Sequence, residues 1–281
     1  MEIFKQIEPL KSFLEVQRRA GKTIGLVPTM GALHNGHVVL IETSKAQNQI
    51  TVCSIYINPT QFNNAVDLEK YPRTLALDTA LLEKIGCEVV FCPENEEMYR
   101  QPSSLTFDFG HFDKVMEGKF RPGHFSGVAL VVAKLFNIVQ PNQAYFGQKD
   151  WQQFAVISQL TEELQFGLKL HGVPTLREAD GLAMSSRNLR LTETQRVKAV
   201  VFHEALLSAK VMIHNGQSIS DVKDSVRRLV EAEPEIRLEY FEVTNSKNLT
   251  VLETIEASSN PIMCIAGYVG EVRLIDNIFL D

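Results

Sequence analysis

Cysteine and tryptophan are scarce in this sequence. Its 281 residues contain four cysteines, none of them in a CxxC pair, and a single tryptophan. A chain of this length buries a sizeable core without disulfide staples, so we expect the cysteines to be small buried side chains in a reducing cytosol. They are Cys53, Cys87, Cys92 and Cys264.

Positive charge is not in excess, and long apolar runs are missing. The chain has 28 Lys and Arg residues against 34 Asp and Glu residues, for a net charge of −6. Proteins that bind nucleic acid usually carry a basic face, so we expect no nucleic-acid partner. No stretch approaches the ~18 apolar residues that cross a bilayer, and the charged N-terminal segment has no apolar signal core. We therefore expect a cytoplasmic protein with no membrane partner.

Short β-branched runs predict buried strands, and they alternate with segments of helical spacing. The expected strands are Thr23–Thr29, Thr51–Ile57, Glu88–Cys92, Ala144–Gly147 and Leu170–Pro174. The expected helices are Gly36–Ala46, Leu75–Ile85, Ser126–Val139 and Asp150–Gln165. This alternation implies right-handed crossovers, and it predicts an α/β fold with a Rossmann-like, doubly wound and mostly parallel sheet.

The pattern changes after about Arg177. Two helices are expected first, at Thr192–His214 and Ser220–Ala232. The strands expected after them are Leu238–Thr244, Ile262–Tyr268 and Val272–Leu280. We therefore expect two domains, a Rossmann-like domain at 1–176 and a smaller α+β domain at 177–281. Ligands of doubly wound sheets bind beyond the carboxyl ends of the strands, so motifs that follow strands are the candidates for chemistry.

The first such motif is PTMGALHNGH. Gly31 permits a turn with unusual dihedral angles, and a helix is expected to begin near Asn35 as its N-cap. His34 and His37 are three residues apart, so they can point the same way from the first helical turn, whose free N–H groups suit a triphosphate. The segment is neither a GxGxxG motif nor a P-loop. A structural role for the two histidines is the alternative.

Two motifs carry amides and a carboxylate. In INPTQFN, Asn58 and Gln61 can donate and accept hydrogen bonds and suit the hydroxyls of a hydroxy acid, although a polar turn is the alternative. Asp78 follows YPRT in a helix. It could help to hold Mg²⁺, or it could be a solvated helix residue.

Three further motifs carry positive charge. Arg121 of FRPGHFSGV could approach a phosphate or a carboxylate. In FGQKDWQQF, Lys149 supplies a compact cation, Asp150 can cap the next helix or assist a metal, and Gln153 lies one turn further on. In MSSRN, Arg187 can bind phosphate in a bidentate manner, and a flexible turn precedes it.

These motifs, in this order from Pro28 to Asn188, resemble those of a known family. HNGH is similar to the HIGH signature of the nucleotidyltransferases related to class I aminoacyl-tRNA synthetases. The longer string resembles the pantothenate synthetases, or pantoate–β-alanine ligases, in particular. MSSR resembles the KMSKS loop of the wider superfamily, a mobile cationic loop that closes over the triphosphate. Gln148 departs from the pattern, because members usually have a Glu there.

The resemblance implies an ATP-dependent ligase of the coenzyme A pathway. It would condense (R)-pantoate with β-alanine through a pantoyl-adenylate, with Mg²⁺, and release AMP and pyrophosphate. A homodimer is also implied. The alternatives are another adenylyltransferase of the superfamily, or a non-catalytic nucleotide-binding module. The neutral amides of Gln61 and Gln153 favour a polyol-acid as the substrate.

The resemblance also implies a set of site residues. His34, His37, Lys149 and Arg187 would stabilise charge on the triphosphate, and His37 could also act as a general acid, since an ordinary histidine titrates near ~6.5. The expected ATP contacts are Met30, Gly31, Ala32, Leu33, His34, Asn35, Gly36, His37, Gly147, Gln148, Lys149, Asp150, Leu176, Met184, Ser185, Ser186 and Arg187. The expected pantoate and β-alanine contacts are Gln61, Gln153, Asn58 and Arg121, and the expected magnesium ligands are Asp78 and Asp150.

Overall fold

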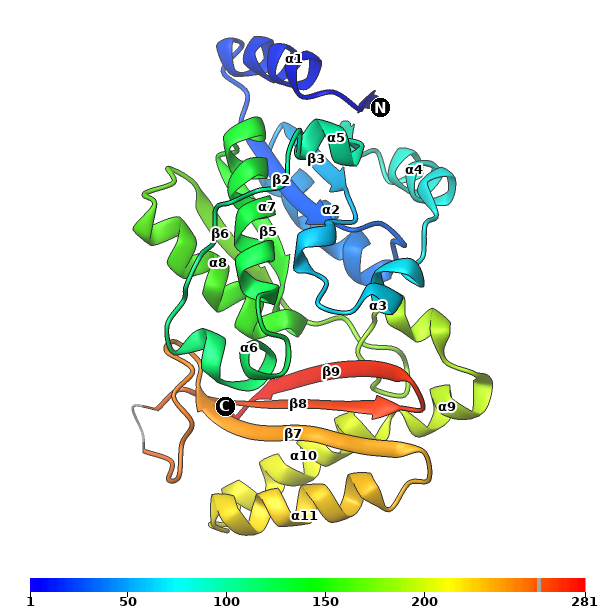
Figure 1. Cartoon of the computed structure of the whole chain (residues 1–281), viewed down its shortest axis with the longest axis vertical. Helices are drawn as coiled ribbons and strands as arrows, with labels where there is room; N and C mark the ends of the chain where they lie inside the picture. Colours follow the sequence, from blue (N-terminus) through cyan, green and yellow to red (C-terminus); the bar gives the residue numbers. More distant parts are fainter. Residues whose placement is uncertain (257–258, 281) are drawn as a thin grey trace.

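A parallel sheet of six strands forms the centre of the larger part of the molecule (Figure 1). The structure is a computed structural model that describes residues 1–256 and 259–280. The strands are β1 (Glu2–Phe4), β2 (Ile24–Thr29), β3 (Ile50–Ile55), β4 (Val89–Phe91), β5 (Gln143–Gly147) and β6 (Lys169–Val173). Their order is β1-β4-β3-β2-β5-β6. The chain winds outward in both directions from β2, so the crevice between β2 and β5 is the switch point at which such sheets bind ligands.

Helices cover both faces of this sheet. On one face, α1 (Ile7–Arg19), α7 (His124–Val139) and α8 (Trp151–Glu163) bury their apolar sides in the largest core cluster. On the other face lie α2 (Asn35–Gln47) and α4 (Leu75–Lys84). The short helical segments are η1 (Pro59–Gln61), α3 (Ala65–Glu69), α5 (Asn95–Met98), η2 (Phe112–Lys114), α6 (Met116–Phe120) and η3 (Gln148–Asp150).

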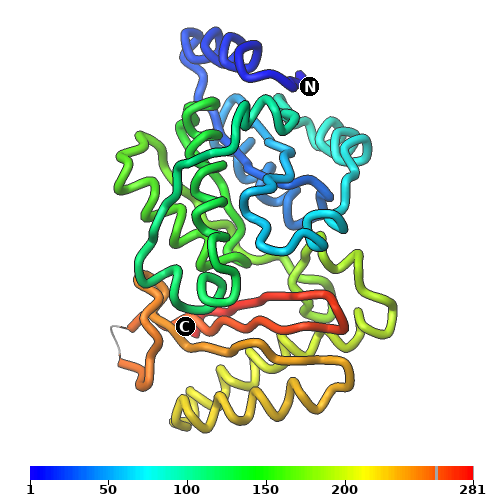
Figure 2. Tube along the Cα trace, in the orientation of Figure 1, coloured from blue at the N-terminus to red at the C-terminus, as the bar shows by residue number. Residues whose placement is uncertain are grey.

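The remaining part is a smaller α+β unit with its own core. Its helical segments are η4 (Ser186–Arg190), α9 (Glu193–Lys198), α10 (Val201–His214) and α11 (Ile219–Glu231), and its strands are β7 (Ile236–Asn245), β8 (Pro261–Val269) and β9 (Val272–Phe279). The strands form an antiparallel sheet in the order β7-β8-β9. One face packs on α10 and α11, and the other packs against α6 and α8 (Figure 1). The last strand, β9, therefore lies next to the larger part, far from the N-terminus (Figure 2).

The fold class predicted from the sequence is confirmed, with two differences in detail. The segment β1–α1 was not predicted, because it looks charged throughout and only Leu10 and Leu14 of α1 are buried. The prediction of a single helix at Thr192–His214 is wrong. This segment forms two helices, since α9 ends at Lys198 and α10 begins at Val201. The chain bends between the two helices, so that Ala199 and Phe202 enter the same core. The apolar spacing of the sequence continues across the bend and therefore does not reveal it.

The structure bears on two expectations from composition, the state of the cysteines and the lack of long apolar segments. All four cysteines are free and buried, as predicted. Within the described ranges, no helix combines the length and the apolar character that crossing a bilayer needs.

A buried ion network joins the C-terminal sheet to helix α6 of the larger part. The guanidinium of Arg273 in β9 donates to Glu117 of α6 at 2.8 and 2.7 Å and to Glu239 of β7 at 2.9 Å. The hydroxyl of Tyr240 donates to Glu117 at 2.8 Å. Burial alone would raise the pKa of Glu117, but the hydrogen bonds and the charge of Arg273 outweigh it and lower the pKa to about 2. Glu117 therefore stabilises the fold above its unfolded pKa, and that contribution is lost as the pH falls toward 2.

The first prediction concerns this network. Arg273→Met keeps the apolar stem but removes the cation that bridges Glu117 and Glu239 and leaves Glu117 with only the more distant Arg121, so we expect a loss of about 3–5 kcal/mol of unfolding free energy at neutral pH. Urea denaturation measures it. Arg227→Ala, which removes the exposed partner of Glu231, is the matched control and should change stability little. A loss no larger than that of the control would show that the network is not a main support of the interface.

Candidate active site

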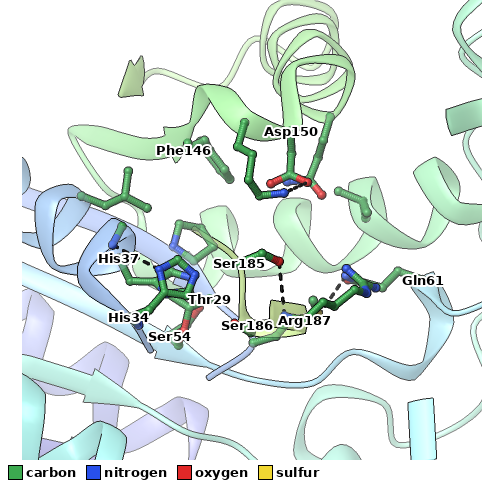
Figure 3. Close-up of a pocket in the computed structure, with 18 of the residues that line it drawn as sticks. Thr29, His34, His37, Ser54, Gln61, Phe146, Asp150, Ser185, Ser186 and Arg187 are labelled. Carbon is green, nitrogen blue, oxygen red and sulfur yellow. Dashed lines mark hydrogen bonds and ion pairs between the residues drawn. The ribbon is translucent and has the colours of Figure 1, made fainter. Parts of the chain in front are cut away.

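A cleft opens at the carboxyl ends of β2, β3 and β5. Its lining comes from the β2–α2 turn, η1, α7, the β5–α8 junction and residues 174–187. Figure 3 shows how the labelled side chains converge on it from these separate elements. The cleft lies at the switch point of the parallel sheet, where the topology places a ligand site.

The paired histidines cap the helix that enters this cleft. His34 is the N-cap of α2, and its Nδ1 accepts the N–H of Gly36 at 3.1 Å. The Nδ1 of His37 in turn accepts the N–H of His34 at 3.2 Å. The expectation that Asn35 is the N-cap is wrong. Asn35 is the first residue of the helix and its side chain is exposed, because an imidazole in place of a short polar side chain makes the cap.

Both imidazoles are neutral in this environment. Burial and the charge of Lys149 lower the pKa of His34 to about 4. Burial, with smaller effects from His34 and Lys149, lowers the pKa of His37 to about 3. Since each Nδ1 accepts a backbone N–H, the ring proton is on Nε2 and is available to a phosphate oxygen. The expectation that His37 titrates near its ordinary value is therefore corrected.

The turn before the histidines is held by a buried carboxylate. Asp78 is 3% exposed and accepts the N–H groups of Ala32 at 3.0 Å and Leu33 at 2.8 Å, and the hydroxyl of Thr74 at 3.1 Å. Gly31 has a φ of +80°, and a Cβ there would lie 3.0 Å from Asp78 Oδ2. All of these donors compete with a metal, and Asp78 is not part of the cleft lining. We therefore withdraw Asp78 as a magnesium ligand and assign it to shaping the turn.

Of the cations Lys149, Arg187 and Arg190, the first two line the cleft, and Arg190 lies outside its lining. Lys149 is 3.2 Å from Asp150. Arg187 donates to Asp67 of α3 at 2.9 Å, and Arg190 reaches the second oxygen of Asp67 at 2.6 Å. The motifs did not indicate Asp67 or Arg190, because neither residue lies in a segment of recognisable pattern.

The MSSRN segment contacts the first motif directly. The hydroxyl of Ser186 donates to the carbonyl oxygen of Ala32 at 2.9 Å. Ser185 caps η4 by accepting the N–H of Arg187 at 3.3 Å. The segment therefore lies over the cleft in this structure.

The amides have two different positions. Gln61 lines the cleft, and its Oε1 accepts a hydrogen bond from Asn58 at 3.1 Å. Asn58 is 1% exposed and also donates to the Gly127 carbonyl at 3.1 Å, so it lies behind Gln61 and does not face the cleft as expected. Gln153 of α8 lines the cleft.

A chain of contacts fixes Gln61 from the buried ion network. Arg121 lies 3.5 Å from Glu117 and 3.1 Å from Nε2 of His124. His124 Nδ1 is 2.8 Å from the carbonyl oxygen of Gln61. Burial first, and then the charge of Arg121, lowers the pKa of His124 to about 3, so the neutral ring donates to Gln61 and accepts from Arg121.

The β5–α8 junction is held from the other sheet. The amide of Asn277 in β9 donates to the carbonyl oxygens of Gln148 at 2.9 Å and Lys149 at 2.7 Å. The side chain of Gln148 donates to Gly172 of β6 at 3.2 Å. Gln148 is thus directed to the sheet edge and away from the cleft.

Most of the predicted residues meet in one place, and some do not. Those that line the cleft are Met30, His34, Gly36, His37, Gln61, Arg121, Gly147, Lys149, Asp150, Gln153, Leu176, Met184, Ser185, Ser186 and Arg187. Those outside the lining are Gly31, Ala32, Leu33, Asn35, Asn58, Asp78 and Gln148. Sequence reasoning missed the apolar wall, formed by Tyr56, Val128, Val131, Val132, Leu135 and Phe146. Its residues look like ordinary core positions.

The protein supplies few ligands for a metal. Among the described residues, no three His, Cys, Asp or Glu side chains are grouped so as to hold an ion. Asp150 is a partly exposed carboxylate that lines the cleft beside Lys149. Magnesium is often held by one or two carboxylates together with substrate phosphates, and Asp150 fits that arrangement.

The chain was compared with known families and with curated proteins. A family model described as "Pantoate-beta-alanine ligase" matches residues 2–279. A pantothenate synthetase of Bacteroides thetaiotaomicron is 45% identical over 278 residues, covering 99% of this chain and 98% of that protein. One of Aquifex aeolicus is 44% identical, covering 98% and 97%.

Solved structures agree with these matches. The pantothenate synthetase of Thermus thermophilus has a TM-score of 0.93 at 38% identity and covers 100% of this chain and 99% of its own. A pantoate-β-alanine ligase of Francisella tularensis, complexed with β-γ ATP and β-alanine, has a TM-score of 0.84 at 34% identity, with coverage of 100% and 98%.

The second prediction concerns the charge of the histidines. Because the pKa values of His34 and His37 are lowered to about 4 and about 3, both rings should stay neutral with the proton on Nε2. NMR of ¹⁵N-labelled imidazoles in the ligand-free protein should show no titration of either ring between about pH 8 and about pH 5.5. His34→Gln and His37→Gln assign the signals. A midpoint near the ordinary histidine value in either ring would contradict the prediction.

The third prediction separates the two tasks considered for Asp78. Asp78→Asn replaces one acceptor by a donor that faces backbone N–H groups, so we expect about 1–3 kcal/mol of lost stability. The Mg²⁺ concentration that gives half-maximal activity should not change. Asp150→Asn is the contrasting variant, in which that concentration should rise. A raised Mg²⁺ requirement in Asp78→Asn with unchanged stability would restore Asp78 as a ligand.

Proposed function

The chain belongs to the pantoate–β-alanine ligase family, and we propose that it joins pantoate to β-alanine in two steps inside the cleft at the carboxyl ends of its parallel strands. As a member of this family it is an ATP-dependent carbon–nitrogen ligase. The observation that carries the mechanism is the convergence of His34, His37, Lys149 and Arg187 on one cleft that also has an apolar wall. The family match sets aside an adenylyltransferase with another acceptor and a non-catalytic nucleotide-binding module.

The first step activates the carboxylate of pantoate. A carboxylate is a poor acyl donor because its leaving group is poor. A carboxylate oxygen attacks the α-phosphorus of ATP, and the bond from that phosphorus to the bridging oxygen breaks, so pyrophosphate leaves with the electron pair. The product is pantoyl-adenylate.

The side chains of the cleft stabilise the charge that moves to pyrophosphate. Positioned donors and cations in a partly buried site do this most effectively. His34 and His37 offer Nε2–H groups at the positive end of α2, and Lys149 and Arg187 offer full charges. Mg²⁺ beside Asp150 would neutralise phosphate charge when ATP is bound.

The second step makes the amide. The neutral amine of β-alanine attacks the acyl carbon of the adenylate, AMP leaves with the electrons of the broken C–O bond, and the nitrogen gives up one proton. Gln61, Gln153 and Arg121 line the same cleft as the apolar wall. This environment suits a substrate with two methyl groups, two hydroxyls and a carboxylate.

We also propose that residues 177–281 form a domain that closes over this site. The contacts that support it are Ser186 with the Ala32 carbonyl and Arg187 with Asp67. Loop closure of this kind completes a site and excludes water. The homodimer and the cytoplasmic location are proposals that rest on the family resemblance alone.

The fourth prediction tests the two-step scheme. Pantoate and ATP should support exchange of labelled pyrophosphate into ATP without β-alanine, because the adenylate forms before the amine reacts. AMP release should require all three substrates. Each substrate is omitted in turn from a coupled AMP assay. Exchange that strictly requires β-alanine would reject the separate adenylate.

Variants complete this experiment. Lys149→Ala should slow pyrophosphate exchange about 10²–10³-fold, because it removes a charge contact to the triphosphate. Lys22→Ala removes an exposed lysine far from the cleft and should leave exchange unchanged. Equal rates in the two variants would remove Lys149 from the mechanism.

A further inference from the structure

One buried hydroxyl in the cleft has no partner. Ser54 of β3 is 0% exposed, and its Oγ forms no hydrogen bond within the described part of the chain. Three other buried side-chain atoms share this property, on Asn188, His203 and Thr244, but only Ser54 lines the catalytic cleft. Buried polar groups in native proteins are nearly always paired, so an unpaired one in a ligand site indicates a partner that comes with the ligand.

The strand places this hydroxyl in an apolar surface. Side chains alternate along β3, and Val52 and Tyr56, two residues on either side of Ser54, belong to the core cluster under α7. Ser54 therefore faces α7, whose Val128 and Val132 form the opposite wall of the cleft. An alanine would satisfy the packing at this position, so packing does not explain a hydroxyl.

The neighbouring hydroxyl of Thr29 shows the contrast. Its Oγ1 donates to the carbonyl oxygen of Ser54 at 2.7 Å and accepts the N–H of Gly31 at 3.2 Å. That hydroxyl is fully used in joining β2, β3 and the turn. The hydroxyl of Ser54 has no such structural task.

We propose that the Ser54 hydroxyl hydrogen-bonds a hydroxyl of pantoate and so helps to select this substrate. The inference rests on the proposed function. The carboxylate of pantoate must reach the α-phosphorus of ATP near the N-terminus of α2 and Lys149, so its methyl groups and hydroxyls are left for the wall under α7. A serine hydroxyl both donates and accepts, which matches an alcohol partner.

The alternative ligand is the ribose of ATP, and the position of Ser54 disfavours it. The N-terminus of α2 offers its N–H groups to the triphosphate, and the nucleotide extends from there. Ser54 faces the other side of the sheet, as shown by its strand neighbours in the cluster under α7 and by the packing of α2 on the opposite cluster. This makes pantoate the partner on that side.

The fifth prediction combines a substitution of Ser54 with changes of the substrate. Ser54→Ala should lower kcat/KM for pantoate about 3- to 10-fold, chiefly through KM, because it removes one neutral hydrogen bond. KM for ATP should not change. Thermal stability should not fall, since no partner within the protein is lost. Pyrophosphate exchange and AMP release both serve as assays.

Two analogues identify the hydroxyl. One is 2-hydroxy-3,3-dimethylbutanoate, which lacks the 4-hydroxyl of pantoate, and the other is 4-hydroxy-3,3-dimethylbutanoate, which lacks the 2-hydroxyl. Wild type and Ser54→Ala should have the same kcat/KM for one of the two analogues. That analogue is the one that lacks the hydroxyl bound by Ser54. A site that hydrogen-bonds a substrate hydroxyl discriminates in this way.

A matched control separates binding from stability. Ser44 is also a fully buried serine, but its Oγ is 2.8 Å from Thr51 Oγ1 and it does not line the cleft. Ser44→Ala should lower thermal stability and leave KM for pantoate unchanged, the reverse of Ser54→Ala.

Several results would overturn the inference. They are equal kcat/KM for pantoate in Ser54→Ala and wild type, an equal defect with both analogues and with pantoate, or a defect confined to KM for ATP. Wild-type protein that fails to turn over pantoate would instead reject the proposed function, so the two failures are distinguishable.

Discussion

The carboxylate of Asp78 organises the turn on which the rest of the site depends. It accepts the N–H groups of Ala32 and Leu33, so the chain after β2 makes a turn at Gly31 and enters α2 with His34 as the N-cap. The cap then fixes the imidazole of His37 through the N–H of His34. The same turn presents the Ala32 carbonyl to Ser186. One buried residue thus sets the orientation of the histidines and the position of the carbonyl group that the MSSRN segment contacts.

The C-terminal sheet supports the opposite side of the cleft through two further buried groups. Glu117 is the first, since it binds Arg273 of β9 and reaches Gln61 through Arg121 and His124. Asn277 is the second, because it holds the carbonyl oxygens of the turn that carries Lys149. The positions of Gln61 and Lys149, which both line the cleft, therefore depend on strand β9, although β9 has no motif of its own.

The sequence predicted what depends on local pattern. Runs such as Ile24–Thr29 are β-branched and buried, so their strands and the motifs after them were found, and the topology brings those motifs together. It could not predict partners chosen by long-range packing. The sequence predicted Asp78 as a magnesium ligand because it is a carboxylate. Only the fold shows that three hydrogen-bond donors surround it. Asn58 was likewise expected in the cleft and lies one layer behind it. In the same way, no local signal could indicate that Asp67 pairs with arginines 120 and 123 residues away.

The pairing of Asp67 with two arginines shows how the MSSRN segment can be held over the cleft and still release Arg187 to a triphosphate. Burial would raise the pKa of Asp67, but Arg187 and Arg190 lower it, so the carboxylate is charged and holds both guanidinium groups. In the proposed closure, the triphosphate offers Arg187 more negative charge than one carboxylate does. When Arg187 turns to the phosphates, Arg190 still lies 2.6 Å from Asp67, so the partly buried carboxylate is not left without a counter-ion. Removing one partner of a buried ion pair is costly mainly because it strands the other charge, and a second arginine avoids that cost. The loop can therefore be preorganised over the cleft at little expense to ATP binding.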